Sequence, residues 1–356
     1  MKAIVKREGA PGLWMEEVER PKPKADEVLI APHITAICGT DLLIYKWNHW
    51  AQKNVPTPLV IGHEFVGEIV ELGSDVEGWK VGDLVSGEGH ITCGKCKVCT
   101  SGKRHLCKET KVIGIHTHGV FAEVFPLPAE NLYRLPEGVS KETAAIFDPL
   151  GNAVHSLFSF PLKNETLLIT GAGPIGVMAV LIAKFAGVKK VVITDINDYR
   201  LDLARKAGAD AAVNITKQSL QEEMKRLGID GFTVATEMSG NSQAFTTILE
   251  EMEPGGKISL LGILPPSTEI DWDLVIFKML ELKGIFGREI FETWDTMKEL
   301  LQAGLSVDKV ITHRFPAEEF EKGFEKMFSG ESGKVLLDWR REKSASLPTE
   351  ERARIA

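Results

Sequence analysis

The feature that most constrains the fold is a glycine-rich turn between an expected strand and an expected helix. Residues 167–170 (LLIT) predict a buried strand, and Gly171-Ala-Gly173-Pro-Ile-Gly176 follows at once and opens a helix expected over 175–186. The first glycine allows a tight turn, the second lets the backbone approach a pyrophosphate, and the third lets helix and strand pack closely. The helix N-terminus favours phosphate charge. The turn predicts a dinucleotide-binding unit, the alternative being a glycine-rich turn without a ligand.

A carboxylate decides which dinucleotide is favoured. Asp195 ends the next expected strand, 191–195, about 20 residues beyond Gly176. A carboxylate there accepts both ribose hydroxyls of the adenosine half, whereas a 2′-phosphate would meet like charge. Arg200 lies nearby and keeps NADP open as the alternative. The sequence therefore favours NAD.

The pattern of expected strands and helices changes along the chain. The first part, residues 1–147, has short β-prone runs separated by Gly, Pro and Asp, whereas residues 148–293 alternate apolar strands with helix-length segments. Residues 294–340 continue a periodic helix and return to strand character near their end. We therefore predict an α/β protein with a mostly β domain, 1–147 with 294–340, and a doubly wound parallel-sheet domain, 148–293. The charged tail, 341–356, is predicted to be flexible.

Charge and cysteine usage exclude several classes of partner. The chain has 42 basic against 50 acidic residues, a net charge of −8, which opposes binding to nucleic acid and to anionic lipid. No apolar run approaches the roughly 20 residues of a membrane helix, and the N-terminus lacks the apolar core of a signal peptide. Five cysteines, an odd number, fit a disulfide framework poorly. We expect a cytoplasmic protein with a small-molecule substrate.

Four of the cysteines form a closely spaced run. The segment is C-x2-C-x2-C-x7-C, with glycines at positions 94 and 102 that relieve the backbone, and its cysteines are Cys93, Cys96, Cys99 and Cys107. Four thiolates at such spacing suit a tetrahedral zinc ion with no position open to water. An iron–sulfur cluster or a redox dithiol is the alternative. The run predicts a structural zinc site.

A second metal site is predicted from residues that are distant in sequence. Cys38 is the remaining cysteine and lies in a turn-like segment, 36–41, while His63 and Glu64 follow an apolar run. Singly, Cys38 suggests a buried core thiol and His63 a surface histidine. Together they supply the three protein ligands that a catalytic zinc needs, with one position left exchangeable.

These motifs, in this order, resemble the zinc-containing medium-chain alcohol dehydrogenase family over residues 1–340. The segments that carry the resemblance are CGTD, GHE, the four cysteines and TGAGPIG. The resemblance implies a GroES-like catalytic domain, a Rossmann domain, one catalytic and one structural zinc per chain, and a homotetramer.

Finer motifs are similar to members that oxidise L-threonine to 2-amino-3-oxobutanoate with NAD; they lie at 44–53, 86–96, 147–155, 237–240 and 287–294. The alternatives are the same chemistry on a polyol or 2,3-diol, and a catalytically silent NAD-binding protein.

The resemblance also implies roles for individual residues. Cys38, His63 and Glu64 match the catalytic zinc ligands, and Thr40 matches the hydroxyl that takes the alcohol proton. His90 matches a residue linked to substrate preference. Asp148 stands where many relatives have another zinc ligand, and the resemblance places it just outside the ligand set. The residues implied to line the NAD site, besides the three glycines, are Ile175, Asp195, Arg200, Leu261, Gly262, Ile263, Ile285 and Phe286.

One position departs from the family pattern. The proton relay usually passes from the hydroxyl residue to a histidine three positions later, and Leu43 stands there. Leucine has no group that transfers a proton. General acid–base assistance is worth about 10²–10⁴-fold, so we expect the relay to run through ribose hydroxyls and water, or turnover to be slower.

Overall fold

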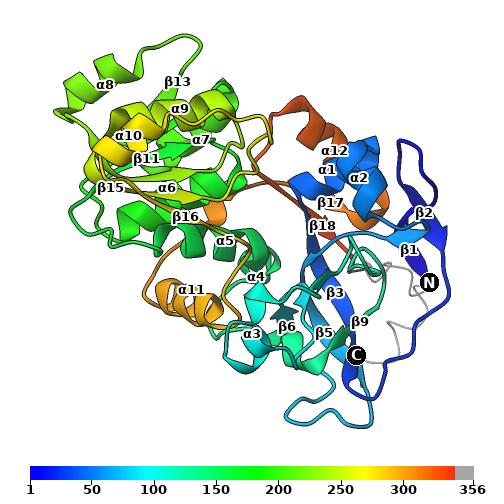
Figure 1. Ribbon diagram of the computed structural model, residues 1–356. Coiled ribbons are helices and arrows are strands. Elements are labelled where there is room, and N and C mark those ends of the chain that lie inside the picture. The colour runs from blue at the N-terminus through cyan, green and yellow to red at the C-terminus, as the bar shows by residue number, and fades with distance from the viewer. Residues whose placement is uncertain (341–356) are drawn as a thin grey trace, which may run out of the picture.

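Residues 1–340 are described by the structure, a computed structural model of the chain, and they form two sheet-based lobes (Figure 1). The prediction of a flexible tail at 341–356 lies outside the described residues. One lobe is built on a parallel sheet and the other on a mostly antiparallel sheet, so the expected α/β class is confirmed.

The parallel sheet carries the glycine-rich turn. Within residues 1–340 it has six strands in the order β13-β12-β11-β14-β15-β16. Their bounds are β11 Thr166–Thr170, β12 Lys190–Asp195, β13 Ala211–Asn214, β14 Phe232–Glu237, β15 Met252–Leu260 and β16 Glu281–Gly284. The chain order reverses between β11 and its two neighbours, β12 and β14, which places a topological switch point at the end of β11.

Helices connect these strands and cover the sheet (Figure 1). They are α6 Pro174–Phe185, α7 Asp198–Ala207, α8 Leu220–Leu227, α9 Ser242–Glu251 and α10 Trp272–Phe277. α6 begins with Pro174 in its first turn, as the sequence predicts, and α7 ends at Gly208 in the left-handed conformation.

The second lobe is built on a larger sheet. Within the described residues it has seven strands, in the order β10-β6-β5-β3-β18-β17 with β9 paired to β3. Their bounds are β3 Glu27–Ile37, β5 Glu64–Leu72, β6 Leu84–Gly87, β9 Phe125–Pro128, β10 Leu132–Arg134, β17 Ile311–Pro316 and β18 Lys334–Asp338. β18 pairs with β3, so the C-terminal strands lie beside the N-terminal part of the chain.

Smaller elements complete this lobe and its junction with the parallel-sheet lobe. The remaining strands are β1 Lys2–Lys6, β2 Trp14–Glu17, β4 Leu59–Val60, β7 His90–Ile91 and β8 Lys111–Val112. The remaining α-helices are α1 Gly39–Lys46, α2 His49–Asn54, α3 Lys97–Thr100, α4 Lys141–Ala145, α5 Phe147–Leu157, α11 Glu292–Gln302 and α12 Phe320–Ser329. Short 3-10 turns lie at Arg104–Leu106, Ala129–Asn131, Asp308–Val310 and Ala317–Glu319.

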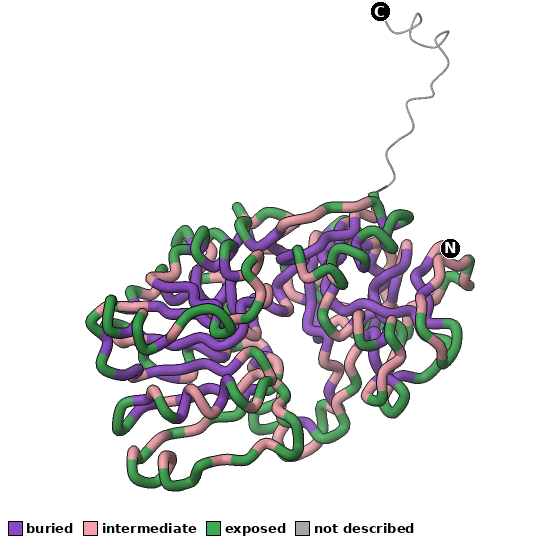
Figure 2. Tube along the Cα trace, turned by 90° about the horizontal axis from the view of Figure 1, so that it is seen from above, coloured by how far each residue is buried: buried purple, intermediate pink, exposed green. Residues whose placement is uncertain are grey.

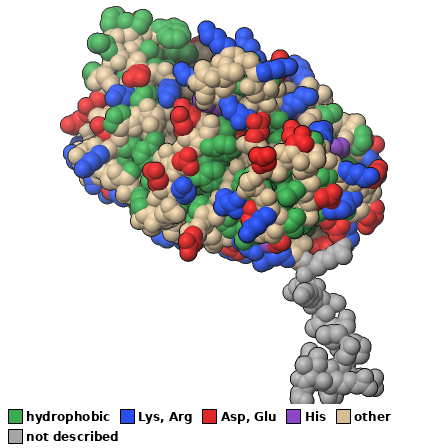
Figure 3. All heavy atoms as spheres, turned by 90° about the horizontal axis from the view of Figure 1, so that it is seen from below, with side chains coloured by type: hydrophobic (Ala, Val, Ile, Leu, Met, Phe, Trp, Pro, Cys, Tyr) green, Lys and Arg blue, Asp and Glu red, His purple; other side chains and the backbone are tan. Residues whose placement is uncertain are grey.

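Burial follows the two sheets. The strands are buried along most of their length, while the helices and connections turn exposed residues outward (Figure 2). Seen from below, basic and acidic side chains are interspersed on the surface (Figure 3). None of the helices in residues 1–340 is long and apolar enough to cross a membrane.

Candidate active site and metal sites

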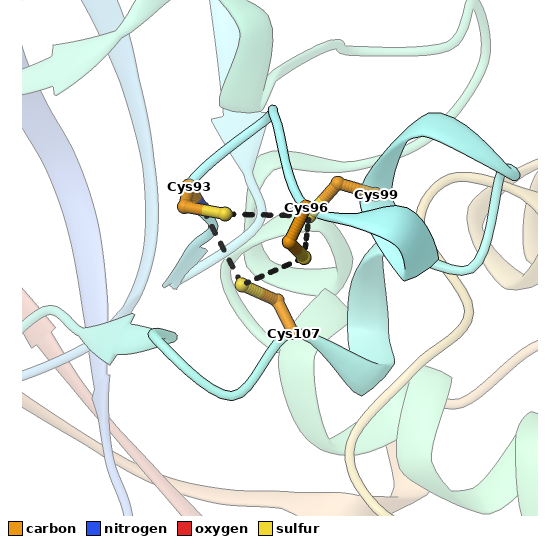
Figure 4. Close-up of side chains that lie close together, drawn as sticks. All are labelled: Cys93, Cys96, Cys99 and Cys107. Atoms are coloured by element: carbon orange, nitrogen blue, oxygen red, sulfur yellow. Dashed lines mark hydrogen bonds between the residues drawn. The ribbon is translucent and has the colours of Figure 1, made fainter.

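The four clustered cysteines converge on one point beside α3 (Figure 4). Their sulfur atoms all lie within 4.8 Å of one another; the Cys96–Cys99 distance is 3.5 Å and the Cys96–Cys107 distance is 4.0 Å. Four sulfurs at the corners of a tetrahedron around zinc are about 3.8 Å apart when each Zn–S distance is about 2.3 Å. The spacing therefore fits a zinc ion.

The backbone around the cluster favours a thiolate at Cys107, whereas burial and the neighbouring sulfurs raise the pKa of Cys99 to about 11. Gly94 and Gly102 both have positive φ, 70° and 81°, which lets the chain turn twice within a short segment. The Cys93 amide donates a hydrogen bond to Cys107 Sγ at 3.5 Å, and this lowers the pKa of Cys107 to about 6. A thiol with a low pKa is already deprotonated at neutral pH, as a zinc ligand must be.

The second donor set lies where β3 and β5 meet. Cys38 follows β3 and precedes α1, and Glu64 begins β5, which is antiparallel to β3 with Glu64 opposite Ala36. This pairing brings the donor atoms of Cys38, His63 and Glu64 within 4.8 Å of one another. Gly62 makes the turn before them at φ 89°, where a Cβ would come within 2.2 Å of the Phe121 ring.

Two of the three donors are buried, and a further carboxylate lies beside them. His63 and Glu64 are buried, and Asp41 Oδ1 lies 4.0 Å from His63 Nδ1. Neither of these two atoms has a hydrogen-bond partner among the described residues. Burial lowers the pKa of His63, but the charges of Cys38 and Asp41 outweigh it and raise that pKa to about 10. A thiolate, an imidazole and carboxylates around one point fit a divalent zinc ion.

A buried lysine balances part of this charge. Lys334, the first residue of β18, lies 2.6 Å from Glu64 Oε2 and 2.8 Å from Glu64 Oε1, and it also donates to the Ile37 carbonyl at 2.9 Å. Burial raises the pKa of Glu64, although Lys334 opposes the rise. Glu64 is therefore paired with the Lys334 ammonium group and could also bind a metal ion.

The other residues expected to act on substrate lie around this donor set. Thr40 is in the first turn of α1, and its Oγ1 is 3.8 Å from Cys38 Sγ. Leu43 follows on the same helix with its side chain 39% exposed. Asp148, in α5, is close enough for its charge to raise the pKa values of His63 and Glu64.

His90 belongs to a buried network that the sequence did not reveal. Its Nδ1 is 2.6 Å from Glu88 Oε1, and Arg288 contacts Glu88, His90 and Asp148. Trp294 Nε1 donates to Glu88 Oε2 at 3.0 Å. Arg288 and Trp294 stand in the motif GREIFETW, so the signal available was a charged residue inside a motif already singled out.

The residues expected to bind NAD gather at the carboxyl ends of the parallel strands. Gly171 follows β11, Asp195 ends β12, Leu261 follows β15 and Ile285 follows β16. Gly176 approaches the turn so closely that a Cβ would lie 2.0 Å from the Gly171 carbonyl oxygen. Ligands of open α/β sheets bind at this edge.

Side chains around this edge differ in their availability. Asp195 accepts hydrogen bonds from the amides of Ala172 at 2.6 Å and Ile196 at 2.7 Å. Arg200 Nε is buried without a partner among the described residues. Ile263 and Phe286 are 89% and 58% exposed, and the Phe286 ring meets the His90 ring edge-on at 5.5 Å. Of the remaining expected positions, Gly173 is the N-cap of α6, Ile175 is in its first turn and Gly262 follows β15.

A parallel sheet of the nucleotide-binding type, together with a site that offers a thiolate, an imidazole and a carboxylate, is typical of metal-dependent dehydrogenases. Residues 24–137 match the family of alcohol dehydrogenase GroES-like domains, and residues 174–303 match the family of zinc-binding dehydrogenases. The chain belongs to the zinc-binding alcohol dehydrogenase family.

Individual relatives cover the described chain almost completely. An L-threonine 3-dehydrogenase from Protochlamydia amoebophila is 58% identical over 95% of this chain and 100% of its own length. Among solved structures, an Escherichia coli CFT073 alcohol dehydrogenase in complex with NADH is 30% identical, with a TM-score of 0.87 over 95% of this chain and 99% of its own. The 2R,3R-butanediol dehydrogenase of Bacillus subtilis is 27% identical, with a TM-score of 0.84 and coverages of 95% and 99%.

Proposed function

We propose that this enzyme oxidises L-threonine to 2-amino-3-oxobutanoate and reduces NAD to NADH. The observation that carries the proposal is the 58% identity to an L-threonine 3-dehydrogenase along that relative's whole length. The structure supports it because the three expected metal ligands lie together and the expected NAD residues gather at one sheet edge. A silent NAD-binding protein would not need a complete donor set.

The chain's residues prepare the site for hydride transfer. Cys38, His63 and Glu64 would hold the zinc, which stabilises negative charge on the substrate oxygen while NAD takes the hydride. Thr40, whose hydroxyl lies beside Cys38, is the group of this chain best placed to receive the alcohol proton. With leucine at position 43, that proton leaves by water or ribose hydroxyls.

The substrate's charged ends need partners near the same point. Asp148 offers a carboxylate for an ammonium group, and His90 offers a ring nitrogen. A polyol or a 2,3-diol would present no ammonium, and the likeness to a butanediol dehydrogenase at 27% identity keeps a diol as the second candidate. The 58% identity to an L-threonine 3-dehydrogenase favours the amino acid.

A panel of alcohols tests the proposal. NADH formation is followed with L-threonine, 2,3-butanediol and sorbitol, together with metal analysis of the same preparation. We expect two zinc ions per chain and a kcat/KM for L-threonine that exceeds the others by at least about tenfold, a difference of about 1.4 kcal/mol in transition-state stabilisation. A diol as the preferred substrate would overturn the proposal, and no NADH from any alcohol with full zinc loading would favour a silent protein.

We also propose that the chain forms a homotetramer in a reducing compartment, the cytoplasm. In support of assembly, α10 exposes Trp272, Ile276 and Phe277 by 58–80%, next to β16 at the edge of the sheet. Large exposed apolar groups beside an unpaired strand edge favour pairing with a second copy. None of the five cysteines, all of which lie in the described residues, forms a disulfide, in keeping with a reducing environment. Light scattering of the purified protein measures the assembly.

A further inference from the structure

Arg288 is a fully buried arginine whose contacts join Glu88 and His90 to helix α5. It follows β16, and its residue is 2% exposed. Its Nε donates to Glu88 Oε2 at 2.8 Å, and Nη2 contacts Glu88 Oε1 and lies 3.0 Å from His90 Nδ1. The remaining nitrogen, Nη1, is directed to α5.

On α5, Nη1 makes three contacts. It lies 2.7 Å from Asp148 Oδ2, and it donates to the Asp148 carbonyl at 3.1 Å and to Asn152 Oδ1 at 3.0 Å. The planar guanidinium thus holds both the backbone and the carboxylate of Asp148 from one side. A charge buried this deeply persists because Glu88 and Asp148 pair with it.

Helix α5 has a glycine at the point where the arginine passes. A Cβ at Gly151 would lie 2.4 Å from Arg288 Cδ and 2.8 Å from Cγ. Glycine inside a helix costs roughly 0.5–1 kcal/mol relative to alanine. The close approach of Arg288 explains why position 151 is a glycine. The fold therefore makes room on α5 for the arginine that contacts Asp148.

Asp148 is near the metal donors and yet outside their group. The donor atoms that lie within 4.8 Å of one another belong to Cys38, His63 and Glu64. Asp148 lies on α5, which packs against β5, the strand that begins with Glu64. A carboxylate is a good zinc ligand, and a fourth protein ligand would close the position that substrate needs.

We propose that Arg288 is a positioning residue that holds the Asp148 carboxylate out of the catalytic metal's ligand sphere and so keeps one metal position free for substrate. The inference rests on the metal site of the proposed function, but it does not depend on which alcohol is the substrate. It predicts that loss of the guanidinium lets Asp148 become a fourth ligand.

Metal release from the intact protein tests this directly. In Arg288→Met we expect zinc release to a chelator to slow by about tenfold, because a fourth protein ligand must then dissociate as well; residues next to the ligands change metal affinity on a scale of about 10–100-fold. The catalytic ion is identified as the one missing from Cys38→Ser. With Co²⁺ in that site, the ligand-field absorption of Arg288→Met should change toward that of a site with four protein ligands.

The double variant Arg288→Met/Asp148→Asn decides the cause. It should release metal at least as fast as the unchanged protein, since asparagine is a poor zinc ligand. Release that is unchanged or faster in Arg288→Met, or slow release that persists in the double variant, would overturn the proposal. Arg314→Met serves as the matched control, because this exposed arginine pairs, among residues 1–340, only with Glu142 on the surface.

A second route avoids removing the buried charge. Gly151→Ala should displace the arginine stem from α5 and slow release in the same direction but less, while Arg288→Lys should do likewise because one ammonium cannot make all these contacts. If both variants fold and release metal like the unchanged protein, the proposal fails. Failure of the threonine assay with normal metal behaviour would instead count against the proposed function alone.

Discussion

Lys334 Nζ lies 2.6 Å from Glu64 Oε2, so an expected metal ligand already has a buried counter-charge. Both side chains are at most 3% exposed. Removing one partner of a buried pair leaves an uncompensated charge and typically costs about 3–5 kcal/mol. We therefore expect Lys334→Met to lower the free energy of unfolding by that amount in metal-free protein and by less with zinc bound, since the ion also stabilises the carboxylate. Urea unfolding with and without zinc measures both values.

A surface pair gives the control for this prediction. Lys322 and Glu319 are 2.8 Å apart and their side chains are 60% and 44% exposed. Exposed pairs contribute about 0–1 kcal/mol, so Lys322→Met should change little. Equal losses in the two variants would show that the burial of Lys334 has no special importance.

Leu43→His is expected to raise the turnover rate, most visibly below neutral pH. Leu43 is 39% exposed and lies one helical turn after Thr40, so a histidine there would reach solvent from beside the hydroxyl. A restored relay removes a proton-transfer step that water or ribose must otherwise provide. The pH profile of kcat measures the effect, with Leu43→Gln as a polar control that transfers no proton; identical profiles for all three proteins would refute the relay argument.

The sequence patterns predicted the positions of the first strand and first helix of the parallel-sheet lobe well. The expected strand at 167–170, the glycine turn and the helix at 175–186 agree with β11 and α6, because each carries a strong local signal. The division at residues 147, 293 and 340 stays a prediction, as do the roles of the site residues. Lys334 and Arg288 were missed because a buried charge is recognised by its partners, which are 270 and 200 positions away along the chain. No local pattern contains that information.

Glu88→Gln should destabilise the protein in a pH-dependent way. Burial raises the pKa of Glu88, but Arg288 and His90 outweigh it and hold that pKa well below its usual range. A carboxyl group with a lowered folded-state pKa contributes stability that is present above its unfolded pKa, about 4.3, and is lost as pH falls toward the folded value. In urea unfolding, the difference in free energy of unfolding between the unchanged protein and Glu88→Gln should therefore stay constant from pH 8 to 5 and become smaller below pH 4.3.

An exposed acid provides the comparison for Glu88. Glu130 pairs with Arg104 at 2.7 Å, and its side chain is 51% exposed. The free energy of unfolding of Glu130→Gln should differ from that of the unchanged protein by close to zero throughout the same pH range. If the Glu88→Gln gap instead closes between pH 8 and 5, the carboxylate is not held by Arg288 as described.

Asp195→Asn is expected to shift the coenzyme preference toward NADP. Asparagine keeps one oxygen for the amides of Ile196 and Asn197, but its NH2 group replaces the oxygen that accepts from the Ala172 amide, so this variant gives up one hydrogen bond of the turn. The substitution removes the negative charge that would repel a 2′-phosphate, and the Arg200 side chain lies close by. The ratio of kcat/KM for NADP to kcat/KM for NAD should therefore rise by about 10-fold or more, which corresponds to about 1.4 kcal/mol. Asp198→Asn, which changes the same net charge at an exposed site paired with Lys217, should leave the ratio unchanged. If the ratio stays the same in Asp195→Asn, or rises equally in both variants, the Asp195 carboxylate does not discriminate between NAD and NADP.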